Sequence, residues 1–326
     1  MIKVLNTLIA VVAGVGGALV VYWLLNFIAE RLPGKWEDRV KPYLYLLPAL
    51  AAIGIFLIYP VVQTVIYSFA NQTSTQWVGF KNYTDLFQQK DFQITLVNTL
   101  LWILVVPVMV VILGLGVATL ADRLRSRGER TAKTLIFLPM AVSGVALAAI
   151  WGFVYEVRPA GEPQVGILNG VVTALGHDPV AWLQESTFKL NTFMLMVVLI
   201  WAQVGFSMVL LSAAIKGVPD DTLEAARIDG ANEAQVFFRV VVPQIWSTVI
   251  TVFVTTVINV MKVFDVVYVM TGGNFNTNVI AVRFFNELIT NGNAGRAAAI
   301  VVVLVIAVIP LMIYQVRHFR AEEAAR

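Results

Sequence analysis

The sequence contains no cysteine, so neither a disulfide framework nor thiolate chemistry is available to this chain. Charged residues are also scarce: they make up 13% of the 326 residues, whereas hydrophobic residues make up 59% and the mean hydropathy is +0.79. The formal net charge of +3 is too small to indicate binding to nucleic acid. We therefore expect a membrane protein that contacts lipid, and we interpret its basic residues as signals of topology.

Histidine is nearly absent as well. His177 falls in a polar connection and His318 lies near the C-terminus, which argues against a Ser-His site or a His-based metal site within the membrane. The chain also lacks the Gly-rich phosphate loop that ends in Gly-Lys-Ser or Gly-Lys-Thr. We predict that the chain is not an enzyme, that it has no catalytic residue and no metal site, and that it binds no cofactor itself.

Apolar runs long enough to cross a bilayer, about 20 residues each, recur along the whole chain. They predict an all-α, polytopic membrane protein with about seven transmembrane helices, and no broken helix is evident from the sequence. The expected spans are Leu5–Ala29, Tyr43–Phe69, Ile94–Ala121, Ala132–Tyr155, Phe188–Ala214, Ile245–Met270 and Ala297–Val316. The first run has a second interpretation as a removable leader, but it is long for a signal peptide and lacks a clear cleavage site.

Lys and Arg are unevenly distributed between the two sets of connections. One set, around residues 31–41, 123–133, 216–239 and 317–326, holds about twice as many as the other. This set should face the cytoplasm, which places the N-terminus outside and the C-terminus inside. The polar segment at residues 217–243 then becomes cytoplasmic.

That segment has the composition of two short helices meeting at a bend. Pro219, followed by two aspartates, suits the start of a helix, and Gly230 interrupts it. Asn232 can cap a second helix with Gln235 reaching back to it, and the apolar residues 236–238 follow. Two interpretations are open: a rigid knob that a soluble protein grips, or an interfacial helix that only anchors the loop.

The residues of the segment match a known pattern. Glu224-Ala225-Ala226, Gly230 and Pro243 resemble, in identity and spacing, the EAA loop of permease subunits of ATP-binding-cassette importers, although Val240 and Val242 replace the usual Ile and Leu. Residues 227–231, 264–273 and 295–299, with Asn98-Thr99-Leu100 and Pro139, are similar to carbohydrate permeases of the maltose-transporter type. The run 270–275 looks most like the α-glucoside subfamily.

The resemblance covers roughly residues 43–320 and implies the organisation of the chain. Residues 1–42 would be an extra transmembrane helix and linker, 43–320 the six-helix permease domain with its EAA loop at 217–243, and 321–326 a cytoplasmic tail. It implies a multi-pass protein of a bacterial or archaeal plasma (inner) membrane. The implied partners are a second homologous permease, an ATPase dimer that uses ATP and Mg²⁺, and an extracytoplasmic sugar-binding protein. The residues implied to couple to the ATPase are Glu224, Ala225, Ala226, Asp229, Gly230 and Phe237.

Polar residues in the span Ile245–Met270 recur at steps of three and four, which keeps them on one helical face. Thr255, Asn259 and Lys262 are candidates to line a wet sugar pathway, and Asp265 follows Lys262 by three residues. Because a charge within the membrane is costly, a lipid-facing Lys262 is not expected. The alternative is an internal Lys262–Asp265 pair that joins helices without touching sugar.

Other polar and aromatic residues are weaker candidates for the pathway. Gln203 and Ser207 lie four residues apart with Trp201 nearby, and Tyr155 ends the fourth expected span. These groups could contact sugar, or they could form interhelical hydrogen bonds and interfacial anchors. An ion-coupled secondary transporter is the main alternative function, with Asp265 as its candidate carboxylate. The sequence does not identify the sugar, how two permeases would share its contacts, or what the first span does.

Overall fold

The computed structural model describes residues 2–31 and 34–325, and this part of the chain is built from α-helices and short helical turns without a β-strand. It divides into two compact units, Met1–Ile66 and Tyr67–Arg326. The division therefore falls inside the region 43–320 that the resemblance assigns to the permease domain. Of the predicted tail 321–326, residues 321–325 continue the last helix, and Arg326 lies outside the described residues.

The first unit is a helical hairpin. Helix α1 (Ile2–Ala29) packs against α2 (Lys35–Ile53), which continues through a π-helical turn, η1 (Gly54–Ile58), into α3 (Tyr59–Tyr67). The Tyr45 hydroxyl donates a hydrogen bond of 2.6 Å to Asn26 Oδ1, and the Tyr45 ring stacks on Tyr22. Leu5–Ala29 and Arg39–Tyr67 are long and apolar enough to cross a membrane, as the sequence predicts.

The second unit is a bundle around two long helices, α5 (Lys90–Asp122) and α9 (Leu190–Lys216). Short α4 (Lys81–Gln88) precedes α5, and η3 (Thr187–Lys189) precedes α9. Between the long helices lie α6 (Ser126–Phe137), η2 (Leu138–Ala141), α7 (Gly144–Val154) and α8 (Ile167–Ala174). After α9 come α10 (Asp220–Ile228), α11 (Glu233–Val236), η4 (Phe237–Val241), α12 (Val242–Gln244), α13 (Trp246–Met261), α14 (Asp265–Thr271), α15 (Ile280–Phe285), η5 (Asn286–Thr290) and α16 (Ala294–Ala325).

Five described helical stretches are long and apolar enough to span a membrane, and two bent pairs bring the number to seven if each pair is one span. The prediction of about seven spans is therefore confirmed, but the expectation of unbroken spans is wrong. Residues 126–141 and 144–154 meet at 106°, and residues 233–244 and 246–261 meet at 70°. The first bend follows η2 and starts a new helix at Ser143, whose Oγ accepts a hydrogen bond from the Ala146 amide.

The expected span Ile245–Met270 is also interrupted. Helix α13 ends at Met261, and α14 begins at Asp265. Lys262 and Phe264 flank the break as the cap residues of the two helices. The hydropathy of the run hides this break, because apolar Val263 and Phe264 lie within it and Val266 follows it.

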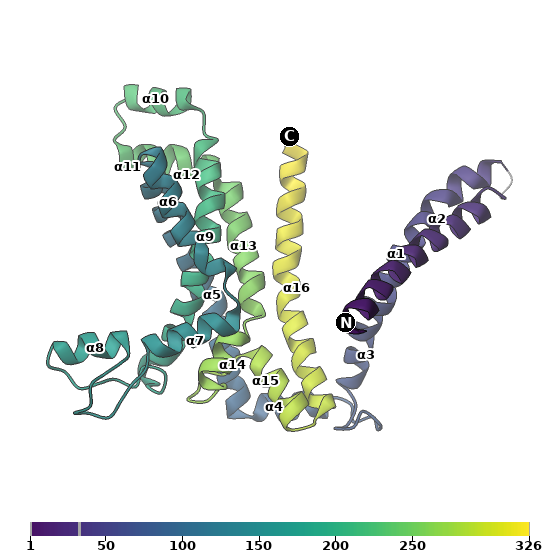
Figure 1. Ribbon diagram of the computed structural model, residues 1–326, viewed down its shortest axis with the longest axis horizontal. Coiled ribbons are helices and arrows are strands. Elements are labelled where there is room, and N and C mark those ends of the chain that lie inside the picture. Colours follow the sequence, from purple (N-terminus) through teal and green to yellow (C-terminus); the bar gives the residue numbers. More distant parts are fainter. Residues whose placement is uncertain (1, 32–33, 326) are drawn as a thin grey trace. The chain divides into compact units, whose positions relative to one another are not determined.

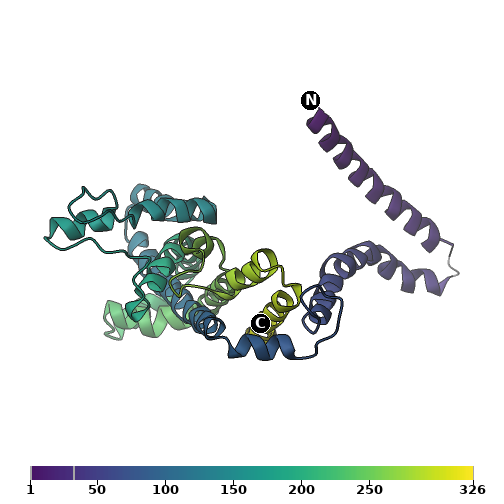
Figure 2. The same ribbon diagram turned by 90° about the horizontal axis from the view of Figure 1, so that it is seen from below.

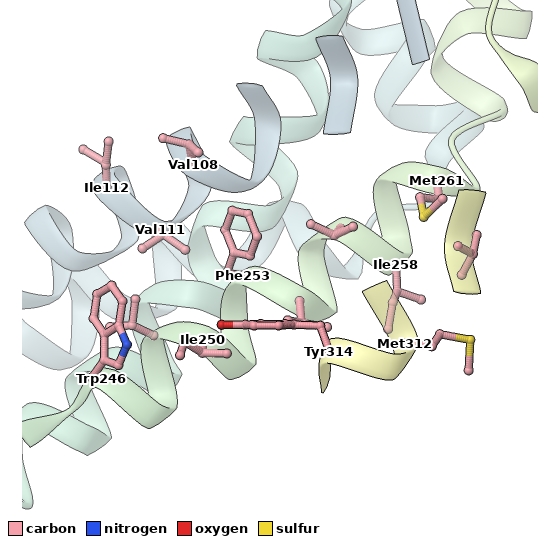
Figure 3. A pocket seen from close by; sticks show the side chains of 14 residues that line it. Val108, Val111, Ile112, Trp246, Ile250, Phe253, Ile258, Met261, Met312 and Tyr314 are labelled. Atoms are coloured by element: carbon pink, nitrogen blue, oxygen red, sulfur yellow. The ribbon is translucent and has the colours of Figure 1, made fainter. Parts of the chain in front are cut away.

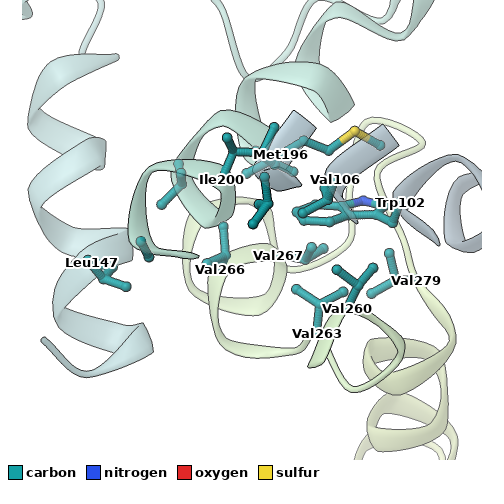
Figure 4. Close-up of a cluster of buried hydrophobic side chains, with 14 of the residues drawn as sticks. Trp102, Val106, Leu147, Met196, Ile200, Val260, Val263, Val266, Val267 and Val279 are labelled. Carbon is teal, nitrogen blue, oxygen red and sulfur yellow. The ribbon is translucent and has the colours of Figure 1, made fainter. Parts of the chain in front are cut away.

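The core of the second unit lies where α5 and α9 cross, with α7, α13 and α14 packed around them. Figure 4 shows Trp102 and Val106 of α5 beside Met196 and Ile200 of α9, above Val263 and Val267. Small residues bring the backbones close at two further points. A Cβ at Gly114 would lie 2.2 Å from Ser207 Oγ, and one at Gly205 would lie 2.4 Å from the Ile136 carbonyl oxygen.

The two ends of this bundle carry different elements. Helix α10 and the C-terminal end of α16 lie at one end, while α4, α14 and α15 lie at the other (Figure 1). Figure 2 views the bundle from the latter end. This arrangement agrees with a topology in which the segment 217–243 and the C-terminus share one side of the membrane, which sequence analysis predicts to be the cytoplasm.

Candidate functional site

Residues 217–243, which we call the EAA segment, form the predicted pair of short helices. Helix α10 follows Pro219, carries Asp220 and Asp221 in its first turn and ends with Arg227 in its last turn. These charges complement the helix dipole at both ends. In Figure 1, α10 lies crosswise over the bundle end, above α11 and α12.

The bend at Gly230 is a complete C-cap. The Gly230 amide donates to the Arg227 carbonyl and the Ala231 amide donates to the Ala226 carbonyl, both at 3.1 Å. This pair of bonds is a Schellman motif, which requires a left-handed residue directly after the cap residue Asp229. Gly230 supplies it with φ of +86°. Ala226 and Ala231, five residues apart, are therefore the two ends of this motif, and Gly230 occupies its left-handed position.

The second helix begins with the predicted capping box. The Asn232 side chain accepts from the Gln235 amide, and the Gln235 side chain accepts from the Asn232 amide, each at 2.9 Å. An ion pair of 2.9 Å between Arg227 Nε and Glu233 Oε1 connects the two helices across the bend. The Arg227 guanidinium lowers the pKa of the Glu233 carboxyl through this hydrogen bond, so the pair is charged at neutral pH.

The inner side of the EAA segment is packed against the bundle. Val236 is buried, and half-buried Leu223, Ala226 and Phe237 contact the same apolar cluster, which includes Leu211 of α9. This packing gives the segment a fixed orientation on the bundle. Phe237 therefore anchors the segment from within, whereas Ala226 contributes both to the packing and to the cap.

The outer side of the EAA segment is exposed. Glu224, Ala225 and Asp229 are accessible, and Ile228 is 85% exposed. Between α10 and the following helices lies a hollow of about 370 Å³ lined by Ala226, Asp229, Gly230, Ala231, Gln235, Arg239 and Val240.

A network of charged side chains supports the base of this segment. Sequence analysis interprets the lysines of this network only as topology signals. Lys133 Nζ of α6 contacts Asp122 Oδ1 at 2.6 Å and Glu129 Oε1 at 2.7 Å, and it also contacts Ser212 Oγ of α9. Lys216, the last residue of α9, pairs with Glu129. The network fixes the ends of α5, α6 and α9 to one another directly before the EAA segment begins.

The polar residues of α13 lie on the helix face opposite an apolar groove. Figure 3 shows this groove of about 500 Å³, into which Ile250 and Phe253 point together with Tyr314 of α16. Thr255 is half-buried, and Asn259 and Lys262 are exposed at the end of the helix. At 100° per residue these three lie on the other side of α13, away from the groove. A sugar pathway along α13 would therefore use that side.

Lys262 and Asp265 do not form an ion pair within the described part of the chain. Asp265 instead lies at the start of α14 against the start of α7, so closely that a Cβ at Gly144 would be 2.3 Å from Asp265 Oδ2. A carboxylate beside a helix N-terminus is favourably placed. This contact gives Asp265 a packing role between α7 and α14.

The remaining candidates of the pathway lie on α9 and at the end of α7. Ser207 is buried against Gly114, and the buried Tyr155 donates a hydrogen bond of 2.9 Å to the Met194 carbonyl. Trp201 is 40% exposed and packs edge-on against Trp151 in an apolar hollow of about 420 Å³. Gln203 is half-buried on α9.

Comparisons with known proteins agree with this architecture. Residues 110–321 match the family described as binding-protein-dependent transport system inner membrane component. The chain is 41% identical to the Alpha-glucoside transport system permease protein AglF of Rhizobium meliloti (strain 1021), over 98% of each chain. It is 47% identical to the Osmoprotective compounds uptake permease protein GgtC of Synechocystis sp. (strain ATCC 27184 / PCC 6803 / Kazusa), over 87% of this chain and 100% of that one.

Among solved structures, a bacterial alginate ABC transporter in complex with an alginate pentasaccharide-bound periplasmic protein contains a chain with the same fold. The TM-score is 0.71 at 22% identity, covering 86% of this chain and 95% of that chain. The structure of this chain contains broken helices, so their absence from the sequence analysis is not an argument against a secondary transporter. The choice between a secondary transporter and an importer permease therefore depends on the protein family. The chain belongs to the binding-protein-dependent transport system inner membrane components, as the resemblance of its EAA segment predicts.

Proposed function

We propose that this chain is the membrane-spanning permease of an ATP-driven sugar importer and that the EAA segment couples it to the ATPase. The observation that carries the proposal is the construction of this segment. It is a bent helix pair with two complete caps, packed inside and exposed outside. A force applied to α10 is passed to α9 and α13, because the same apolar cluster holds all three.

The partners in this proposal are an ATPase dimer beneath α10, a second homologous permease, and an extracytoplasmic sugar-binding protein. ATP and Mg²⁺ would be used by the ATPase, since this chain has no phosphate-binding loop. The structure of the alginate transporter in complex with its alginate pentasaccharide-bound periplasmic protein supports an external delivery protein. Glu224 would meet a basic residue of the ATPase, and the exposure of its side chain on α10 supports this contact.

The substrate we propose is an α-glucoside or a related oligosaccharide, which is the class named for the Rhizobium relative. The polar face of α13, with half-buried Thr255 and exposed Asn259, would supply hydrogen bonds to its hydroxyl groups. The relative from Synechocystis is named for osmoprotective compounds, so small compatible solutes are the alternative substrate class.

The test is purification of the intact complex and measurement of ATPase stimulation by binding protein loaded with different solutes. The panel contains maltose, trehalose, sucrose, alginate oligosaccharides and glycine betaine. We expect one or more α-glucosides to stimulate hydrolysis. Stimulation by glycine betaine alone would indicate that the substrate is a compatible solute and not a sugar. Failure of the ATPase to co-purify with this chain would contradict the coupling role.

A further inference from the structure

Helix α6 has two faces with different surroundings. On the inner face, Glu129 and Lys133 are half-buried in the charge network, and Ile136 packs against the apolar clusters of the bundle. The opposite side is exposed, and at 100° per residue its members lie within a sector of about 140°. We call this side the outer face of α6, and it consists of Arg127, Arg130, Thr134, Leu135 and the cap residue Leu138.

The positive charges at the start of α6 are not balanced by the protein. The two carboxylates nearest to them in sequence, Asp122 and Glu129, are held by Lys133 and Lys216. Arg125, directly before the helix, adds a third exposed guanidinium group to the two of the outer face. None of these three arginines forms an ion pair within the described part of the chain, so their charge is open to an anionic partner.

The outer face changes from basic to apolar along the helix. Helix α6 starts at the bundle end that carries α11 and runs from there toward α7 (Figure 1). At its far end, Leu135 is 63% exposed and Leu138 is 60% exposed. The helix axis rises about 16 Å from Arg127 to Leu138, close to the roughly 15 Å of hydrocarbon in one lipid leaflet. The face is therefore basic at headgroup depth and apolar at acyl-chain depth.

Charge complementarity identifies the occupant of this face. Guanidinium groups bind phosphate oxygens through charge-assisted hydrogen bonds, and basic residues beside a membrane attract anionic lipids. A water-soluble partner would cover the arginines but not the leucines, because residues 126–141 and 144–154 together are apolar enough to cross a membrane. A neutral lipid or an apolar helix would cover the leucines and leave the arginines unpaired.

We propose that the outer face of α6, together with Arg125, binds anionic phospholipid in the leaflet on the side of the EAA segment. The lipid phosphate bonds to the guanidinium groups of Arg127 and Arg130, and the acyl chains lie on Leu135 and Leu138. Bound lipid thereby holds the helix whose inner face carries the charge network at the base of the EAA segment. The inference goes beyond the proposed function, because it involves neither sugar nor ATP.

The absence of cysteine from the chain allows a local test. Leu138→Cys places a bimane label at the apolar end of the outer face. The chain, purified with the subunits that accompany it, is reconstituted in vesicles that contain brominated phosphatidylglycerol or brominated phosphatidylcholine, and quenching of the label measures lipid bound there. The preparation without the substitution gives the background. Each arginine near the surface contributes about fivefold in affinity, so phosphatidylglycerol should be preferred by a factor on the order of 100.

Arg127→Gln combined with Arg130→Gln should lower this preference about 25-fold, whereas replacement of both arginines by lysine should retain most of it. Lys81→Gln combined with Lys90→Gln is the matched control, since it removes two exposed charges from the opposite end of the bundle and should change nothing. Equal quenching by the two lipids in the chain with all its arginines would overturn the proposal. Absence of quenching by either lipid would also overturn it, because a protein surface would then cover the face.

Discussion

The backbone at Gly230 gives the sharpest prediction about coupling. At its φ of +86°, the backbone of an L-residue is strained by about 1–2 kcal/mol. A Cβ at this position would have no atom within 4 Å, so the cost comes from the backbone and not from a clash. Gly230→Ala should therefore weaken the Schellman motif by roughly 1 kcal/mol, because a stiffer unfolded chain offsets part of the strain. Gly230→Asn should cost less, since asparagine tolerates the left-handed region.

Gly230→Pro is the severe variant of this series. Proline fixes φ near −65° and removes the amide that donates to the Arg227 carbonyl, so we expect a local cost of about 3 kcal/mol or more. The cap lies outside the core formed by α5 and α9, so the variant should still enter the membrane and bind the second permease. ATP-driven uptake should decrease in the order Gly, Asn, Ala, Pro.

The assay is uptake of labelled sugar into proteoliposomes that contain the complex, normalised to the amount assembled. Gly128→Ala is the matched control: Gly128 lies inside α6 near the same end, and its added Cβ would meet Leu124 at an ordinary 3.6 Å. That variant should keep full uptake. Normal uptake by the Pro variant would refute the reasoning, because the bend would then not transmit force.

Three further predictions concern other groups. Glu224→Lys should uncouple ATP hydrolysis from uptake, with Glu224→Gln intermediate, and a normal ratio of sugar taken up to ATP hydrolysed in both variants would remove this residue from the contact. Asn259→Ala should raise the KM for sugar uptake without loss of assembly. Unchanged uptake kinetics would mean that the polar face of α13 has a structural role and does not contact the sugar. Lys133→Met removes the cation shared by Asp122 and Glu129 and should lower stability by roughly 1–3 kcal/mol, seen as a lower Tm in detergent, whereas the exposed Arg125→Met should not.

Features encoded by neighbouring residues could be predicted from the sequence. The caps of the EAA segment depend on Gly230, Asn232 and Gln235, whose partners lie within five residues, so composition alone indicates two helices and a bend. The spans could be predicted from the length of their hydrophobic runs. The bend at Ser143 could not, because a single capping hydrogen bond inside an apolar stretch leaves the hydropathy unchanged.

Features that depend on tertiary contacts could not be predicted. Lys133 contacts Ser212, 79 residues away, and Asn98 contacts Asn276, 178 residues away, so no local pattern reveals either cluster. The alternative pairing of Lys262 with Asp265 assumes an unbroken helix, and the break after Met261 removes that assumption. The buried Ser207 shows the same limit, since its four-residue spacing from Gln203 does not reveal that it faces Gly114.

The source of energy tests the central claim most directly. Vesicles that contain this chain alone are compared with vesicles that contain the co-purified complex and its binding protein, each given an ion gradient or internal ATP. The account predicts accumulation of labelled maltose or trehalose only by the complex and only with ATP. Accumulation by this chain alone, driven by the ion gradient, would contradict it.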